Sequence, residues 1–441
     1  MSHRAYLTKD EVVKVDQLER SYKSQEGVLN FACSGVFPSH VIASANLALY
    51  YVTPDEGKAP RVIKYAMLPI TNEVAKDIHG TATTSPFGRG SELVYDDSYR
   101  QARELKPPYF SLTSDILSAS SLLTLLAKKL NYDSPLEARM NKLNAYTEGG
   151  FFKAHKDTPQ SEHHIGTLII CLPTPFTGGD LVIRQMGASV TFDWSNQVQD
   201  GSITWGFLYS DCEHEVLPVT SGTRVTISYD IFVSKDVKAF DQSVMDTRLQ
   251  PLLDTFETLL KDAKFLISGG TLAFGLVHDY PFGENDRGFP GDLRNRLKDS
   301  DAVLVSAIEK LGLEMEYFAI YDYESSCYEV VEERPIDEAD AKAEEMDNTF
   351  KRGIWIADDV HKCNRDHCIY DDTAEELGLK QDLDLIWVTF PASYDTKNSY
   401  ITFGNEPQAA TVYCAVGVKV EIPKASTRLH QKPIPRTAKS G

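Results

Sequence analysis

The stretch from Met140 to Val233 decides the fold, because short β-rich segments follow one another there with turn signals between them. The segments are MNKLNAY (140–146), FFKAHKD (151–157), HIGTLIICL (164–172), DLVIR (180–184), SVTFDW (189–194), SITWGFLY (202–209), HEVLPV (214–219) and RVTISYDIFV (224–233). Turn-forming residues separate them, including the glycine pairs at 149–150 and 178–179. Eight short strands in roughly ninety residues predict a double-sheet jelly roll or a small barrel.

The sequence before this stretch predicts two helices and several short β-like runs. Residues 8–23 form an amphipathic helical pattern, with its apolar positions on or near one face at Val12, Val13, Val15 and Leu18. Residues 114–130 carry a second helical pattern, and residues 28–70 contain β-like runs broken by Pro and Gly. We therefore expect an N-terminal domain over residues 1–235, with a barrel core at about residues 140–233.

A second α+β domain is predicted over residues 239–423, beyond a boundary near residues 234–238. Helical patterns cover residues 239–265 and 298–312. Strand-like runs occur at GTLAFGLV (270–277), EMEYFAIYDY (314–323), LDLIWVTF (383–390) and ATVYCAVGVKVEI (410–422). We expect this domain to be non-catalytic, and a degenerate second β-helix barrel is one form it can take. A flexible basic tail is predicted over residues 424–441.

The composition excludes several classes of function. Hydrophobic residues make up 42% of the 441 residues and charged residues 25%, the balance of a soluble globular protein. The net charge of −19 repels phosphate backbones and anionic lipid surfaces, so a nucleic-acid substrate is disfavoured. No run of about 18 apolar residues predicts a membrane span, and the first residues lack the apolar core of a signal peptide. Seven scattered cysteines fit a reducing compartment, so we expect an intracellular protein of the cytoplasm or nucleus.

Two histidines and one aspartate in the predicted barrel are candidate metal ligands. His155 and Asp157 are two positions apart on a predicted strand, so their side chains point to the same face. His214 on a later strand is the candidate third ligand. Two imidazoles and one carboxylate form the facial triad of non-haem Fe(II) oxygenases, which leaves coordination positions open. Each imidazole must be neutral to bind iron, so we expect the affinity to fall below about pH 6.

Arg224 follows His214 by ten residues (224 − 214) and is the candidate binding residue for a cosubstrate. It begins an apolar strand, and its guanidinium is expected to point inward on the face that it shares with Thr226. A buried guanidinium requires a planar carboxylate partner, because it cannot be neutralised and binds carboxylates through two hydrogen bonds. A dicarboxylic cosubstrate such as 2-oxoglutarate meets this requirement.

These residues resemble the catalytic domain of the Fe(II)- and 2-oxoglutarate-dependent dioxygenases, in the prolyl-4-hydroxylase-like branch. The resemblance covers about a fifth of the chain, from about Asn144 to Val233. Its matching stretches are Tyr146-x-x-Gly149-Gly150-Phe151-Phe152-x-x-His155-x-Asp157-Thr158, Gly178-Gly179-Asp180-Leu181 and His214-Glu215-Val216-x-Pro218-Val219-x-x-Gly222-x-Arg224-x-Thr226. Two positions depart from the commoner pattern of the branch. Asp180 stands where Glu is usual and is interpreted as structural, and Arg224 stands where the branch often has Lys.

The resemblance implies a double-stranded β-helix with the preceding helices as buttresses, in which His155, Asp157 and His214 hold iron. It further implies that Arg224, helped by Thr226, binds the distal carboxylate of 2-oxoglutarate and that the phenol of Tyr146 bonds the same carboxylate. The implied reaction consumes O2 and 2-oxoglutarate, releases succinate and CO2, and hydroxylates an unactivated C–H bond. The substrate is a protein side chain of the prolyl type or a small molecule, and ascorbate is a candidate reductant. The oligomeric state is left open.

Two other classes of function remain as alternatives. One is a metal-binding sensor module that keeps the barrel and has lost turnover, and the other is an interaction scaffold whose functional part is the C-terminal domain. The sequence motifs for nucleophilic catalysis by Ser-His-Asp or Cys-His are not found.

Several further residues have an ordinary structural interpretation. His163 and His164 are expected in a surface turn, and Trp205 in the core. Two interpretations of Arg184 are equally favoured, a place at the substrate opening and an exposed salt bridge. Two interpretations of residues 86–95 are also equally favoured, a loop folded over the site and a plain connector. Metal sites are disfavoured for the set His361, Cys363, His367 and Cys368 and for the pair His278 and Asp279. The acidic stretch 332–347 is expected to be a solvated helix or loop.

Overall fold

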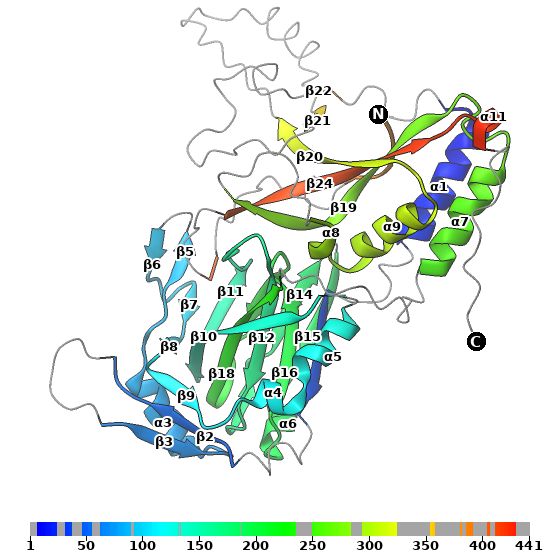
Figure 1. Cartoon of the computed structure of the whole chain (residues 1–441). Coiled ribbons are helices and arrows are strands. Elements are labelled where there is room, and N and C mark those ends of the chain that lie inside the picture. The colour runs from blue at the N-terminus through cyan, green and yellow to red at the C-terminus, as the bar shows by residue number, and fades with distance from the viewer. Residues whose placement is uncertain are drawn as a thin grey trace, which may run out of the picture.

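The structure is a computed structural model of the whole chain. It describes residues 7–23, 31–37, 46–54, 62–89, 92–130, 132, 134–185, 187–234, 249–283, 293–323, 353–357, 380–381, 385–390, 404–405 and 411–428. Two β-rich units lie one above the other, with the barrel below and a second sheet with its helices above (Figure 1). Among the described residues, no helix combines the length and the apolar character needed to cross a lipid bilayer.

One wall of the barrel is a large antiparallel sheet centred on two long strands, β10 (Leu136–Thr147) and β18 (Val219–Val233). On one side β18 pairs with β12 (His164–Cys171), which is followed by β16 (Thr204–Tyr209) and β1 (Ala32–Val36). On the other side β10 pairs with β8 (Arg103–Leu105), which is followed by β4 (Thr83–Thr84). A short strand, β13 (Phe176–Gly178), pairs with the start of β18.

The opposite wall is a five-stranded sheet. Its strands, in spatial order, are β15 (Ala188–Phe192), β14 (Leu181–Gln185), β17 (Glu213–Val216), β11 (Phe151–His155) and β7 (Arg100–Gln101). Buried side chains of both walls belong to one hydrophobic core, including Leu168 and Ile170 from the large sheet and Leu181 and Ile183 from the small one. Two facing sheets around one core form the predicted double-stranded β-helix. All eight segments predicted as strands between Met140 and Val233 are confirmed.

Helices cover the outer face of the large sheet. α3 (Asn72–Thr81) packs against β10 and β18, and α5 (Leu122–Lys129) packs against β10. The helical pattern predicted over residues 114–130 is confirmed, but as two helices, because Ser121 has φ +53° and separates α4 (Ile116–Ser120) from α5. α3 was not predicted from the sequence. Thr71 begins it, accepting a hydrogen bond from the backbone of Val74.

Three short strands form a separate small sheet within the N-terminal region. β2 (Ala48–Tyr51) lies between β3 (Lys64–Met67) and β9 (Phe110–Leu112). Two further strands, β5 (Phe87–Arg89) and β6 (Glu92–Val94), form a hairpin. The β-like character predicted for residues 28–70 is therefore confirmed in β1, β2 and β3, while residues 38–45 and 55–61 lie outside the described residues.

The second unit contains one six-stranded sheet with helices on one side. Its strand order is β22 (Lys380–Gln381), β21 (Gly353–Ala357), β20 (Met315–Tyr323), β24 (Thr411–Ile422), β19 (Gly270–Gly283) and β23 (Leu385–Thr389). The helices are α7 (Leu249–Lys261), α8 (Leu293–Arg296), α9 (Asp299–Lys310) and α11 (Ala425–Arg428). The predicted degenerate second barrel stays a prediction, since residues 324–352 and 358–379 lie outside the described residues.

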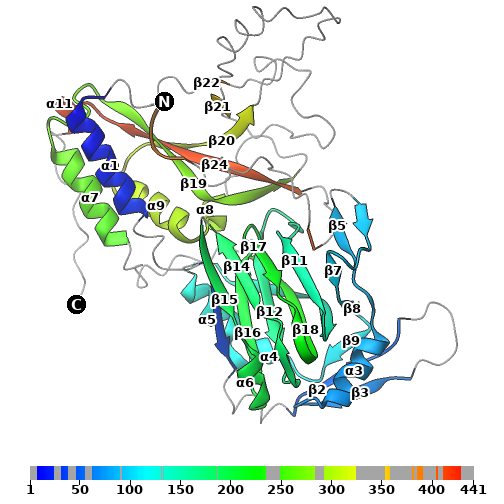
Figure 2. The ribbon, with the colours of Figure 1, turned by 180° about the vertical axis from the view of Figure 1, so that it is seen from behind.

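The first helix, α1 (Lys9–Lys23), packs in the second unit and not against the barrel. It lies along α7 in both views (Figures 1 and 2), and its buried side chains Val15, Leu18 and Tyr22 belong to the core of the second unit. The expected place of Val13 on the buried face is wrong, since its side chain is 59% exposed. The sequence predicted the helix but placed it with the wrong partner, because an amphipathic pattern shows that one face is buried and not what covers it.

Candidate metal and cosubstrate site

The structure brings the three predicted metal ligands together on the small sheet. β11 ends at His155, Asp157 lies two residues beyond it, and His214 lies in β17. β11 and β17 are antiparallel neighbours with His155 directly opposite His214, so the two imidazole rings lie with their centroids 4.3 Å apart. All three side chains are buried, and one ligand atom from each lies within 4.8 Å of the other two. Among the described residues this is the single group of this kind.

Hydrogen bonds orient both imidazoles so that their Nε2 atoms face the site. Nδ1 of His155 lies 2.8 Å from the carbonyl oxygen of Lys153, and Nδ1 of His214 lies 3.1 Å from that of Cys212. A carbonyl accepts a hydrogen bond only from a protonated nitrogen, so these contacts assign the proton to Nδ1 and leave a lone pair on Nε2. Nε2 of His214 lies 3.7 Å from Oδ1 of Asp157.

Thr167 holds the carboxylate of Asp157 from behind. Its hydroxyl, on strand β12 of the large sheet, donates a hydrogen bond to Oδ2 of Asp157. One carboxylate oxygen is thereby fixed and the other is turned towards His214, the arrangement that a metal ligand requires. Thr167 could not be identified from the sequence, because its contact with Asp157 depends on how the two sheets pack and not on a motif.

The surroundings of His155 favour its neutral form. Burial is the main cause that lowers the pKa of His155 well below its usual value, and the nearby His214 lowers it further. Phe152 lies on the same strand, and its ring stacks on the imidazole with the two centroids 3.6 Å apart. His155 therefore remains neutral at a lower pH than an exposed histidine does, and in that neutral form it can bind a metal.

Arg224 lies buried in β18, and two of its guanidinium nitrogens lack a hydrogen-bond partner among the residues that the structure describes. Its side chain is 1% exposed, and the two nitrogens are Nε and Nη2. The guanidinium carbon lies 5.5 Å from the ring centroids of both Tyr146 and Trp194. Trp194 follows β15 of the small sheet, so the guanidinium points into the barrel. A buried cation without a partner is costly, and an anion between the two sheets would satisfy it.

Tyr146 and Thr226 share the inner face with Arg224. Tyr146 on β10 is the direct cross-strand partner of Arg224, and Thr226 lies two positions further along β18. Side chains two positions apart, or directly opposite one another, point to the same face of a sheet. Gly179 permits this packing, because a Cβ atom there would lie 2.9 Å from Cδ of Arg224. The predicted carboxylate-binding group is thus assembled on one wall, and the donor set fits the distal carboxylate of 2-oxoglutarate.

A buried polar group that the sequence did not reveal lies beside the candidate site. Nη2 of Arg100 donates to Oδ1 of Asn144 at 2.8 Å, and its guanidinium carbon lies 4.4 Å from the ring centroid of Phe152. Lys142 and Glu104 form a buried ion pair with a distance of 3.7 Å between Nζ and Oε2. Lys142, Asn144 and Tyr146 alternate along β10, so this polar group continues the inner face that carries Arg224.

The prediction of a surface turn at His163 and His164 is wrong, because both side chains are buried. His164 is the first residue of β12, and its Nε2 donates to the carbonyl of Gly166 at 3.0 Å while its Nδ1 accepts from the backbone of Gln160 at 3.3 Å. Its ring packs against Phe232 with the centroids 5.2 Å apart. Strand pairing between β12 and β18 causes this burial, which cannot be predicted from two adjacent histidines in the sequence.

The remaining predicted residues have structural roles. Trp205 is a core residue, as expected, and its indole fills the space above Gly35. Arg184 forms ion pairs with Glu213 and Glu215 at the surface, the salt-bridge alternative. His278 bonds to a carboxylate of the barrel and belongs to no group of metal ligands among the described residues. The candidate zinc residues 361–368, the acidic stretch 332–347 and tail residues 429–441 lie outside the described residues.

Residues 86–95, for which the sequence left open a loop over the site and a plain connector, contain the hairpin of β5 and β6. Its Phe87 ring packs on Tyr99 with centroids 4.5 Å apart, and the hydroxyl of Tyr99 donates to the carbonyl of Ala154 at 2.5 Å. Ala154 directly precedes His155, so the hairpin is attached through Tyr99 to the strand that carries the first ligand.

The family model of the 2OG-Fe(II) oxygenase superfamily matches residues 141–229, which contain all six predicted site residues. The chain therefore carries a domain of this superfamily, whose members are oxidoreductases that use Fe(II), 2-oxoglutarate and O2. The protein is accordingly an enzyme of the dioxygenase class. No curated protein sequence matches the chain.

The solved structures that match the chain are distant from it in sequence. A prolyl hydroxylase from Trichoplax adhaerens, in complex with a peptide fragment of the hypoxia inducible factor oxygen degradation domain, is 14% identical with a TM-score of 0.29, and the match covers 52% of this chain and 96% of that one. A Pseudomonas putida prolyl-4-hydroxylase is 13% identical with a TM-score of 0.28, over 49% and 100% of the two chains. A 2OG-Fe(II) oxygenase from Burkholderia pseudomallei is 16% identical with a TM-score of 0.24, over 38% and 81%.

Proposed function

We propose that the protein is an Fe(II)- and 2-oxoglutarate-dependent hydroxylase of the prolyl-4-hydroxylase-like branch. It inserts a hydroxyl group into an unactivated C–H bond of a protein side chain of the prolyl type or of a small molecule, with succinate and CO2 as coproducts. The observation that carries the proposal is the pairing of two features inside one barrel. A buried His-Asp-His group stands on one wall, and a buried guanidinium with unsatisfied nitrogens stands in the same core.

The chain's own residues supply binding, orientation and exclusion of water. His155 and His214 would hold the metal through Nε2 and Asp157 through Oδ1, each already oriented by a hydrogen bond to its far side. Arg224 would bind the distal carboxylate of 2-oxoglutarate through its free nitrogens, with Tyr146 and Thr226 beside it. When bound, Fe(II) and 2-oxoglutarate supply the oxidising chemistry.

Succinate formation tests the proposal without knowledge of the substrate. Purified protein with Fe(II), 2-oxoglutarate, ascorbate and O2 is expected to form succinate slowly even when no substrate is added. His155→Ala and His214→Ala each remove one metal ligand and are expected to reduce this rate to background. His79→Ala is the matched control, because His79 lies on α3 outside the site. Retained succinate formation in either ligand variant would refute the assignment of the metal ligands.

The same assay separates the enzyme from the sensor alternative. A sensor module binds Fe(II) through the same three residues but forms no succinate above background in the wild-type protein. The scaffold alternative predicts neither metal binding nor succinate formation at the barrel.

A further inference from the structure

The second unit contacts the residues that lie next to the metal ligands. Gly404 forms a parallel bridge with Lys156, the residue between His155 and Asp157. Gly404 also exchanges two backbone hydrogen bonds of 2.9 Å with Gly88 in the β5–β6 hairpin. A segment that lies far along the chain is thus positioned between the ligand loop and the hairpin.

The loop that carries Asp157 is held by hydrogen bonds from both units, and one of those from the N-terminal unit joins Nε2 of Gln160 to the carbonyl of Thr158 at 3.2 Å. Within the barrel, the backbone nitrogen of Asp157 donates to the carbonyl of Ser210 at 3.2 Å. From the second unit, the hydroxyl of Tyr413 donates to the carbonyl of Asp157 at 3.3 Å, and Oδ1 of Asn405 accepts from the backbone nitrogen of Thr158 at 3.0 Å. Two of these four hydrogen bonds to the backbone of the loop therefore come from residues more than 240 positions away.

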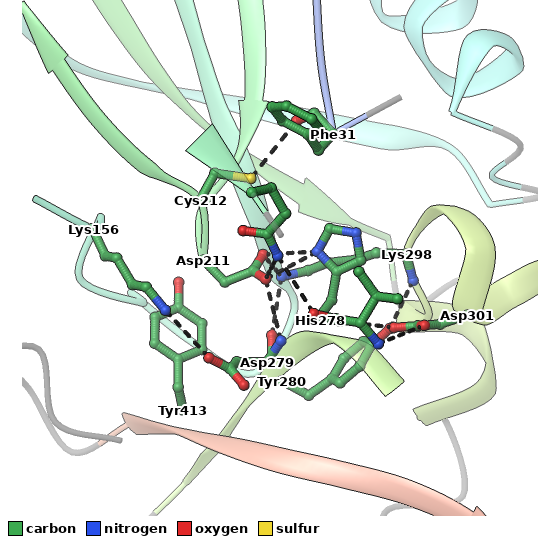
Figure 3. A network of polar contacts seen from close by, with 12 residues as sticks. Phe31, Lys156, Asp211, Cys212, His278, Asp279, Tyr280, Lys298, Asp301 and Tyr413 are labelled. Atoms are coloured by element: carbon green, nitrogen blue, oxygen red, sulfur yellow. Dashed lines mark hydrogen bonds and ion pairs between the residues drawn. The ribbon is translucent and has the colours of Figure 1, made fainter. Parts of the chain in front are cut away.

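The loop that leads to His214 is fixed by the second unit as well. Asp211 precedes Cys212, whose carbonyl orients the imidazole of His214. The carboxylate of Asp211 lies 2.7 Å from Nζ of Lys298 and 2.9 Å from Nδ1 of His278, and it accepts a third hydrogen bond from the backbone of Asp279. Figure 3 shows these side chains converging from both units around Asp211.

An ion pair also joins the second unit to Lys156, which lies between the metal ligands His155 and Asp157. Nζ of Lys156 lies 3.3 Å from Oδ2 of Asp279, while Asp279 donates its backbone N–H to Asp211. Figure 3 shows Lys156 and Tyr413 on one side of this network and Asp301 on the other. One segment of β19, residues 278–279, therefore contacts both ligand-bearing loops.

We propose that the second unit is a structural part of the metal centre, in which Tyr413 and Asn405 are positioning residues for Asp157. This inference rests on the proposed function only through the identity of the metal ligands. Metal affinity depends on ligands being held in place before the ion binds, and loss of an orienting partner typically weakens it by about 10- to 100-fold. The second unit supplies two of the four contacts at the ligand loop, so the barrel alone is expected to bind metal less tightly than the full chain.

Co(II) binding to the full-length apo-protein tests the proposal without turnover. Tyr413→Phe removes only the hydroxyl that bonds Asp157, and it is expected to weaken Co(II) binding by about tenfold and to change the visible d–d absorption of the bound ion. Asn405→Ala removes the second contact from a partly buried side chain and is expected to have the same effect. The thermal unfolding midpoint of each apo-variant is measured alongside.

Tyr51→Phe is the matched control. Tyr51 is also a buried tyrosine, and its hydroxyl donates to Asp77 at 2.8 Å in a region away from the ligand loops. It is expected to lower the unfolding midpoint as much as Tyr413→Phe does and to leave Co(II) binding and its spectrum unchanged. Wild-type affinity and spectrum in both Tyr413→Phe and Asn405→Ala would overturn the inference and leave the proposed function intact. Failure of the wild-type protein to bind Co(II) would overturn both.

Discussion

At the scale of single residues, Arg224 is the side chain whose environment most directly indicates a ligand. Most buried guanidinium groups bond to carboxylates or carbonyls, yet Nε and Nη2 of Arg224 have no partner among the described residues, and two aromatic rings lie beside the group. Cation–π contacts offset part of the cost of burial but leave the N–H groups unsatisfied. The residue is therefore suited to binding an anion and contributes little to stability when none is bound.

This leads to a prediction in which stability and binding change in opposite directions. Arg224→Met is expected to weaken 2-oxoglutarate binding by 100-fold or more, about 3 kcal/mol, because a charge-assisted pair is lost. The free energy of unfolding without cosubstrate is expected to stay equal or rise, because an unsatisfied buried charge is removed. Calorimetric titration of the Co(II)-loaded protein and urea unfolding measure the two quantities. A lower stability together with unchanged 2-oxoglutarate affinity would contradict the assignment.

The residues of the site differ in how far the sequence could reveal them. His155 and Asp157 could be predicted from the sequence, because two residues that are two positions apart on a strand point their side chains to the same face of the sheet. Thr167 and Tyr413 could not, because their contacts with Asp157 arise from the packing of the two sheets and from the packing of a distant segment. His164 was misplaced for the same reason, since its burial depends on β18.

At the scale of elements, the contact between β13 and the start of β18 depends on the glycine at position 222. Gly222 has φ +76°, and a Cβ atom there would lie 2.1 Å from the carbonyl oxygen of Pro175. Residues with a side chain rarely adopt this conformation, and backbone atoms cannot move aside cheaply. The close approach of β13 to the start of β18 therefore requires glycine at this position.

Gly222→Ala is expected to reduce the free energy of unfolding by about 3 kcal/mol. Gly80→Ala is its control, because Gly80 lies at an exposed position in α3 with no heavy atom within 4 Å of an added Cβ. There the substitution is expected to stabilise the protein by about 0.5–1 kcal/mol, since alanine favours the helix. Urea unfolding measures the change in the free energy of unfolding for both variants, which is expected to be a loss for Gly222→Ala and a gain for Gly80→Ala. Equal changes would show that position 222 does not require glycine.

The elements were predictable where the local pattern alone determines them. The eight barrel strands have alternating or continuous apolar runs with turn residues between them, so their order was evident from the sequence. The break at Ser121 was not, because serine permits a helix and the left-handed conformation is set by the surrounding structure. The strands were therefore predictable, whereas their partners across the sheet, and the partner of α1, were not.

At the scale of the whole molecule, the two units share a buried charged network. Burial alone would raise the pKa of Asp211, but the charges of Lys298 and His278 outweigh it and hold that pKa below its usual value. Both side chains of the ion pair between Asp211 and Lys298 are 1% exposed. Nothing in the local sequence around either residue predicts this contact, because charged residues are normally expected at the surface. The predicted boundary near residues 234–238 lies outside this network and stays a prediction.

Removing one partner of this network is expected to destabilise the whole chain. Lys298→Met removes the ammonium group that pairs with the buried carboxylate of Asp211, and the free energy of unfolding is expected to fall by about 3–5 kcal/mol. Lys261→Met is the comparison, because Lys261 pairs with Glu257 on the exposed face of α7 and is expected to contribute less than about 0.5 kcal/mol. Similar losses in the two variants, measured by chemical unfolding, would argue against a structural role for the buried pair.

The central claim, that one ferrous ion and one 2-oxoglutarate bind together in this barrel, is tested most directly by an anaerobic absorption titration of the apo-protein. We expect a visible charge-transfer band that requires both Fe(II) and 2-oxoglutarate, reaches its maximum at one equivalent of iron, and bleaches when air is admitted. The band is expected to be absent in His214→Ala, which lacks one ligand. A wild-type protein that shows no such band, or a His214→Ala variant that shows an undiminished one, would contradict the account.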